Sequence, residues 1–221
     1  MTSFRHSQLQ RPLMVICFVI GGLVLLYVGS SQGAFDLVIE VDRTSQLRSL
    51  DDAMTSEPPD IVFLTQSLRS SDWYIAARAA DRLRILRLEG RLEGDKAALA
   101  LSSLIQGLAS GGHWWRFGWD REETDYEAFR GAAIEAVAAF GEEGLPYIVT
   151  ATTSRSPDAR EAACWVLLTM LKRASIDPDS GVITSEVSTR VQVLADNDES
   201  FEVRVACGSV QDWVASHESQ Q

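Results

Sequence analysis

The sequence predicts an all-α fold, an α-solenoid of stacked antiparallel helix pairs preceded by one transmembrane helix. Two observations lead to this prediction. First, an arginine followed two residues later by alanine recurs four times, each time among apolar residues at helical spacing. Second, the arginines lie 52, 30 and 44 residues apart, which fits a unit of about 30 residues lengthened twice by loops. The four are Arg78, Arg130, Arg160 and Arg204.

The N-terminal part is predicted to anchor the chain in a membrane. Residues 1–12 are polar, and the 17 residues from 13 to 29 carry no charge. As a helix this run is about 25 Å long, almost the thickness of a hydrocarbon core. We predict a cytoplasmic tail at 1–12 and a transmembrane signal anchor at 13–31. The alternative is a signal peptide cleaved before Ala34, where small residues precede the bond.

Charges around this segment predict its orientation. Arg5 and Arg11 precede it, and Asp36 and Glu40 follow it closely. By the positive-inside tendency the N-terminus stays in the cytoplasm, so the rest of the chain lies outside the cytoplasm at the cell membrane. If the segment is cleaved, the protein is instead secreted or periplasmic.

Residues 32–59 are predicted to be a juxtamembrane linker. Residues 35–41 alternate briefly between apolar and polar, and a short strand, a tether and the start of a helix all remain open. Ser56 to Asp60 contains two prolines and breaks regular structure, and a short helix is expected to open there at 61–68.

The repeat domain is expected over residues 60–215, followed by a polar tail at 216–221. Ser71 and Asp72 signal the start of the first long helix, and Pro157 suits the first turn of a later one. We expect each long helix to form a hairpin with the helix that follows it in the chain. The first expected long helix begins at Ser71-Asp72 and ends before Gly90. The later helices are expected at 95–109, 124–140, 142–152, 157 to about 174 and about 183–194, and the last begins near Asp198 with Trp213 facing inward.

Two stretches resemble a known repeat family. Phe129-Arg-Gly-Ala-Ala-Ile-Glu-Ala-Val-Ala-Ala-Phe-Gly-Glu-Glu-Gly-Leu-Pro and Ser156-Pro-Asp-Ala-Arg-Glu-Ala-Ala are similar to the short bacterial HEAT repeats, also called PBS-lyase HEAT-like repeats. The resemblance covers about residues 60–215. It implies a right-handed α-solenoid of antiparallel helix pairs that binds proteins along a concave face. Some members attach bilins, but no motif here supports that activity.

The composition argues against nucleic-acid binding and against a zinc site. The net charge is −11, and only two lysines occur, so clustered positive charge for nucleic acid is missing and we expect no nucleic-acid partner. Cys17, Cys164 and Cys207 form no CxxC motif and no cluster with histidine, so no zinc site is indicated. We expect Cys164 and Cys207 to be small buried thiols; a disulfide between neighbouring repeats is the alternative.

The repeated arginines admit two roles. They could form a row that recognises an acidic partner, or they could each tie one repeat to the next through nearby carboxylates. We expect the second role for Arg78, Arg130, Arg160 and Arg204. The acidic candidates near the helix starts are Asp72, Asp125, Asp158 and Glu199.

An aromatic insertion between the helix pairs is the predicted partner-binding site. The stretch from Gly111 to Arg121 holds three of the chain's six tryptophans. Exposed, these rings could anchor a protein, a sugar or the membrane interface. They could equally fold back over an apolar gap. The proposed contact residues are Trp114, Trp115, Arg116, Phe117 and Trp119.

Catalysis is not expected. The three histidines are scattered, and the chain contains neither a nucleophile elbow nor a glycine-rich phosphate loop. The acidic run from Glu122 to Glu127 suits a solvated helix start better than a metal site. We therefore predict no metal, no cofactor and no enzyme activity. The expected function is a membrane-anchored scaffold for an unidentified protein; the alternative is a secreted or periplasmic accessory factor of an enzyme or pigment-attachment system.

Overall fold

The structure is a computed structural model, and it describes residues 42–109, 120–173 and 185–218. Within these ranges the chain is helical, with no strand. The fold is therefore all-α, as predicted. The predicted transmembrane segment at 13–31 lies outside the described residues. None of the helices in the ranges above combines the length and the apolar character needed to cross a membrane.

Helix boundaries follow local signals that the sequence carries. Asp72 is the N-cap of α3, and its side chain accepts a hydrogen bond from the Tyr74 amide at 3.0 Å. Gly90 and Gly94 adopt positive φ angles of 69° and 57° in the turn after α3, a conformation that favours glycine. The helices are α2 (Ile61–Ser67), α3 (Trp73–Leu88), α4 (Gly94–Ala109), α5 (Asp120–Ala138), the short 3-10 helix η1 (Gly141–Gly144), α6 (Leu145–Thr152), α7 (Pro157–Lys172), α8 (Ser185–Asn197) and α9 (Phe201–Glu218).

Two ends of the predicted repeat domain differ from the structure. Residues 42–55, within the predicted linker, are helical, and Leu50 and Ala53 of this helix join the hydrophobic core. At the other end α9 continues to Glu218, so the first part of the predicted polar tail at 216–221 is helical.

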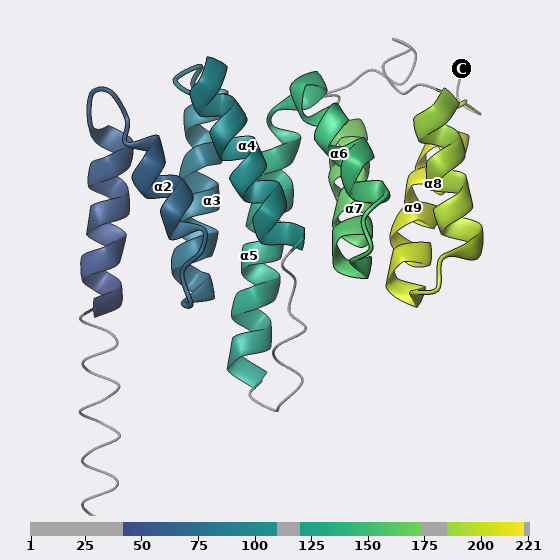
Figure 1. The fold of residues 1–221 in the computed structure, drawn as a ribbon, viewed down its shortest axis with the longest axis horizontal. Coiled ribbons are helices and arrows are strands. Elements are labelled where there is room, and N and C mark those ends of the chain that lie inside the picture. The colour runs from purple at the N-terminus through teal and green to yellow at the C-terminus, as the bar shows by residue number, and fades with distance from the viewer. Residues whose placement is uncertain (1–41, 110–119, 174–184, 219–221) are drawn as a thin grey trace, which may run out of the picture. The chain divides into compact units, whose positions relative to one another are not determined.

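Within the unit Leu47–Gln221, the helices pack in two successions (Figure 1). The long helices α3, α5, α7 and α9 contact one another in order, and α2, α4, α6 and α8 do the same. The two sets are joined by the pairs α2–α3, α4–α5, α6–α7 and α8–α9.

The sequence prediction of which helices pair with each other is wrong. The sequence predicts that the helix after Asp72 pairs with the 95–109 helix, but α4 packs more extensively on α5 than on α3. The same holds for α6, which packs on α7. The reason is that the apolar faces of α3 and α5 are buried mainly against each other. Trp73 of α3 lies with its ring centroid 5.1 Å from Tyr126 and 5.3 Å from Phe129 of α5.

The core is a continuous cluster built from the predicted stripes. Phe129, Ala133, Val137 and Phe140 are buried, as their helical spacing requires. Small residues line the contacts between long helices, which lets the backbones approach closely. On α7, which packs between α5 and α9, ten residues are buried.

Cys164 of α7 and Cys207 of α9 form a disulfide, so our expectation of two buried thiols is wrong. Both residues are fully buried, and their Cα atoms are 5.1 Å apart. Each occupies a small-residue position where α7 and α9 pack together. Two helices that approach this closely place the sulfur atoms within bonding distance.

Candidate functional site

The repeated arginines differ in what they bind. Arg78 is exposed and donates to the Tyr74 hydroxyl on its own helix, at 3.3 Å from Nε and 3.0 Å from Nη2. Among the side chains that the structure describes, Arg78 contacts no residue of the next long helix, so the expected tie is not seen at this position.

Arg130 joins α5 to α7. Its guanidinium donates to the Glu161 carboxylate, which also accepts from the Trp165 indole N–H at 3.0 Å. Burial alone would lower the pKa of Arg130, but the charge and the hydrogen bond of Glu161 outweigh it and raise that pKa. The contact thus joins two neighbouring long helices through a carboxylate of α7.

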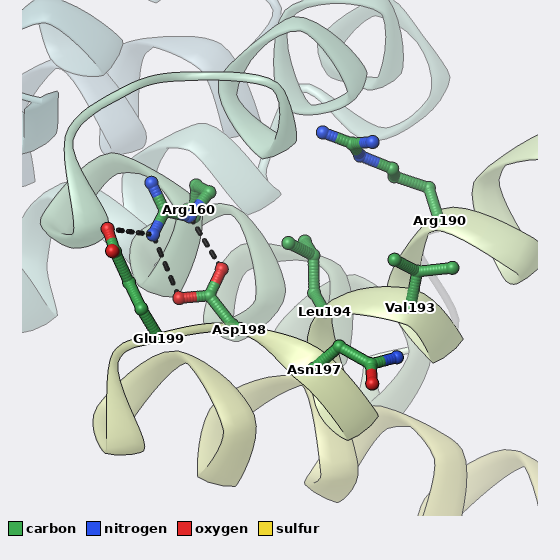
Figure 2. Close-up of a pocket in the computed structure, with 7 residues that line it drawn as sticks. All are labelled: Arg160, Arg190, Val193, Leu194, Asn197, Asp198 and Glu199. Atoms are coloured by element: carbon green, nitrogen blue, oxygen red, sulfur yellow. Dashed lines mark hydrogen bonds and ion pairs between the residues drawn. The ribbon is translucent and has the colours of Figure 1, made fainter.

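Arg160 joins α7 to the start of α9. Its side chain is 9% exposed, and it donates to both carboxylate oxygens of Asp198, from Nε at 2.7 Å and from Nη2 at 2.8 Å (Figure 2). Its Nη1 donates to the carbonyl oxygens of Ser154 at 2.9 Å and Arg155 at 3.2 Å. Glu199 adds an ion pair at 3.6 Å. Two carboxylates, those of Glu199 and Asp198, therefore bind Arg160. The sequence prediction named Glu199 as a candidate but missed Asp198.

This pair shifts both pKa values. The hydrogen bonds to Asp198 raise the pKa of Arg160 more than burial lowers it. Burial would raise the pKa of Asp198, whose side chain is 4% exposed, but it is outweighed. The hydrogen bonds from Arg160 and from the Ser200 amide hold the pKa of Asp198 below its ordinary value of 3.8. Both groups are therefore charged at neutral pH.

Arg204 on α9 repeats only part of this arrangement. Its Nη1 donates to the carbonyl oxygens of Asp198 at 2.6 Å and Glu199 at 3.3 Å, six and five residues earlier. Arg160 makes the same contacts with residues six and five positions before it. The guanidinium of Arg204 also lies 5.8 Å from the Phe201 ring centroid.

A surface pocket of about 330 Å³ lies beside the Arg160–Asp198 pair. In Figure 2 Leu194 lies between that pair and Arg190, which belongs to α8. Arg190 donates to the Thr152 carbonyl at 3.4 Å, a long hydrogen bond, and Val193 is 45% exposed. Asn197 and Glu199 complete the lining. The pocket thus offers a cation, an amide, a carboxylate and an apolar side chain, a mixture suited to a polypeptide segment.

Sequence reasoning missed this pocket. Arg190 is outside the arginine-alanine repeat, and its relation to Thr152 depends on how α8 packs beside α6. The predicted aromatic site, Trp114, Trp115, Arg116, Phe117 and Trp119, lies outside the described residues, so it stays a prediction. Within the part of the chain that the structure describes, no three His, Cys, Asp or Glu side chains gather as metal ligands would.

Comparisons of the chain with family models, with curated proteins and with solved structures gave no match. In the described residues, the class of protein that the fold and the site define is an all-helical domain in which α5, α7 and α9 are joined by one part-buried and one buried arginine–carboxylate pair and by a disulfide.

Proposed function

We propose that this protein is a non-catalytic, membrane-anchored scaffold that holds a protein partner. In this proposal the helix pairs form a HEAT-like, right-handed α-solenoid. The observation that carries it is the packing order: each long helix contacts the long helix of the next pair, and the second set of helices follows the same order. Stacking of this kind produces an extended surface, which repeat proteins use for binding.

The second set of helices carries the apolar side chains that a partner would need. Each of these helices exposes one large apolar residue, and the four helices pack in succession. They are Val62 on α2 at 55%, Leu99 on α4 at 43%, Tyr147 on α6 at 37% and Val193 on α8 at 45%. We assign the partner to this surface, with the pocket around Arg190 and Val193 as its best-formed part.

The disulfide supports a location outside the cytoplasm. Disulfides form and persist in oxidising compartments and are rare in the reducing cytosol. Cys164–Cys207 therefore agrees with the predicted topology, in which the anchor at 13–31 leaves the helical domain outside the cytoplasm. It agrees equally with a secreted or periplasmic protein after cleavage before Ala34. Measuring the N-terminal mass of the mature protein decides between these two.

Site-specific photo-crosslinking tests the proposed partner surface. A photoreactive residue at Val193 of the full-length protein, expressed in its native membrane, should give a discrete adduct with a second protein. Arg190→Ala should reduce that adduct, because it removes the cation of the pocket but leaves the buried core intact. The matched control carries the photoreactive residue at Leu88, which is 62% exposed but lies on α3.

The same experiment includes the aromatic insertion. If Trp114→Ala/Trp115→Ala abolishes the Val193 adduct while helical content is unchanged, the insertion contributes to the same partner site. If adducts are missing at Val193, Leu99 and Tyr147 alike, the proposed surface is refuted.

A further inference from the structure

The outward face of α9 has no helix against it in the described part of the chain. The helix packs on α7 and α8 through Val203, Ala206, Cys207 and Val210, which are buried. Its opposite face exposes Phe201 at 65% and Val205 at 44%. A terminal helix of a stack normally has a polar outer face, because apolar side chains there invite further stacking. Phe201 and Val205 therefore give this face the apolar character that packing against a further helix requires.

The contacts of Arg204 indicate which chemical group would complete the packing on this face. Arg160 uses Nη1 for two carbonyl groups and its Nε and Nη2 atoms for both oxygens of Asp198. Arg204 makes the equivalent Nη1 contacts, but within the described residues its Nε and Nη2 atoms have no acceptor. In Arg160 the Nε–Nη2 edge of the guanidinium holds α9 against α7, whereas in Arg204 the same edge binds no acceptor among the described residues.

The outward face of α9 matches itself in the antiparallel orientation. Phe201, Arg204, Gly208, Asp212 and Ala215 follow one another at steps of three, four, four and three residues, so they share one face of the helix. This spacing is symmetric about Gly208. A two-fold axis beside Gly208 therefore brings Arg204 level with the partner's Asp212, and Phe201 level with the partner's Ala215.

The side chains along this face suit such a contact. No atom lies within 4 Å of the position that a Cβ of Gly208 would occupy, so nothing of the described chain fills the crossing point. Asp212 and Ala215 are exposed, and within the described residues Asp212 has no ion pair. A large Phe201 ring facing a small alanine leaves room for the ring, and two Arg–Asp pairs fix the register.

We propose that a second copy of this chain is the occupant: two α9 helices cross antiparallel at Gly208, and Arg204 of each binds the partner's Asp212. The contact makes the protein a symmetric homodimer. It goes beyond the scaffold function and does not depend on it, since the partner surface assigned above lies on α2, α4, α6 and α8.

Charge exchange between two variants tests this arrangement. The full-length protein, purified in detergent micelles, should sediment as a dimer. Arg204→Asp and Asp212→Arg should each weaken the dimer about tenfold or more, since both replace two attractive contacts by like-charge contacts. An equimolar mixture of the two variants should recover the dimer, because in the mixed pair each contact between positions 204 and 212 again joins a guanidinium to a carboxylate. Recovery on mixing cannot arise from a merely structural role of either residue.

A second variant protects the test against misfolding. Arg204→Asp also removes two intrachain hydrogen bonds, so Gly208→Arg, for which the fold has open space, provides an independent disruption. The matched control is Gly131→Arg on α5, the same change at another exposed helical glycine with open space around it. A monomeric wild-type protein at micromolar concentration, a Gly208→Arg dimer of unchanged affinity, or a mixture that stays monomeric overturns the proposal.

Discussion

Removing the Asp198 carboxylate should lower stability more than any other single change at the arginine contacts. In Asp198→Ala, Arg160 keeps its charge inside a site where its side chain is 9% exposed. Breaking a buried ion pair by deleting one partner costs about 3–5 kcal/mol. The carbonyls of Ser154 and Arg155 and the exposed Glu199 remain near the guanidinium, so we expect the lower end, about 3 kcal/mol.

Thermal unfolding followed by circular dichroism measures this effect. For a chain of this size, about 3 kcal/mol corresponds to a decrease in Tm of about 6–12 °C. The double variant Arg160→Met/Asp198→Ala removes both charges, and replacing a whole buried pair by apolar groups is often close to neutral. It should therefore be more stable than Asp198→Ala. If the double variant is the less stable of the two, or if Asp198→Ala lowers Tm by under about 2 °C, the buried-charge argument fails.

The same carboxylate gives a pH dependence with a defined sign. Because the pKa of Asp198 is lower in the folded protein than its ordinary value of 3.8, the unfolded chain binds the proton first as pH falls. The stabilisation is complete above this ordinary value and is lost as pH falls through it toward the folded pKa. Asp198→Asn has no such titration. The Tm difference between wild type and Asp198→Asn should be constant near neutral pH and shrink below about pH 4; a difference that grows on acidification contradicts the assignment.

Two further predictions concern α9 and the α4–α5 contact. Cys164→Ala/Cys207→Ala opens a loop with a sequence separation of 43, which should cost about 4 kcal/mol by the loop-entropy relation; unchanged Tm with and without reductant would contradict the disulfide. Gly107→Ala should destabilise by about 1–3 kcal/mol, since its Cβ would lie 2.9 Å from the buried Phe129 ring, whereas Gly131→Ala, with open space around it, should stabilise by up to about 1 kcal/mol. Equal Tm values for these two glycine variants would show that the α4–α5 contact is looser than described.

Local signals predict the helices well. Asp72 caps α3, and Pro157 opens α7, because capping and the fixed φ of proline act within one turn of the chain. The helix at 42–55 is missing from the sequence prediction, although Leu47, Leu50 and Met54 repeat at three and four residues. That narrow stripe is the signal that could have identified it.

Contacts between distant residues cannot be predicted in the same way. The sequence predicts that the recurring arginines join neighbouring repeats; the structure shows Arg130 and Arg160 in ion pairs with a neighbouring long helix or its start. Their acceptors, Glu161 and Asp198, depend on which helices pack together. Arg78 shares the motif but points to Tyr74, because the identity of a short motif does not fix which way its helix is rotated.

The disulfide between Cys164 and Cys207 also determines how the chain responds to force. A pull between the two ends of the chain can extend every residue except those enclosed between the two sulfurs. At about 3.5 Å for each extended residue, the sequence separation of 43 corresponds to about 150 Å of contour length, which cannot extend until the disulfide is reduced. Stretched under oxidising conditions, the protein is therefore shorter by that length, with α8 held inside the closed loop.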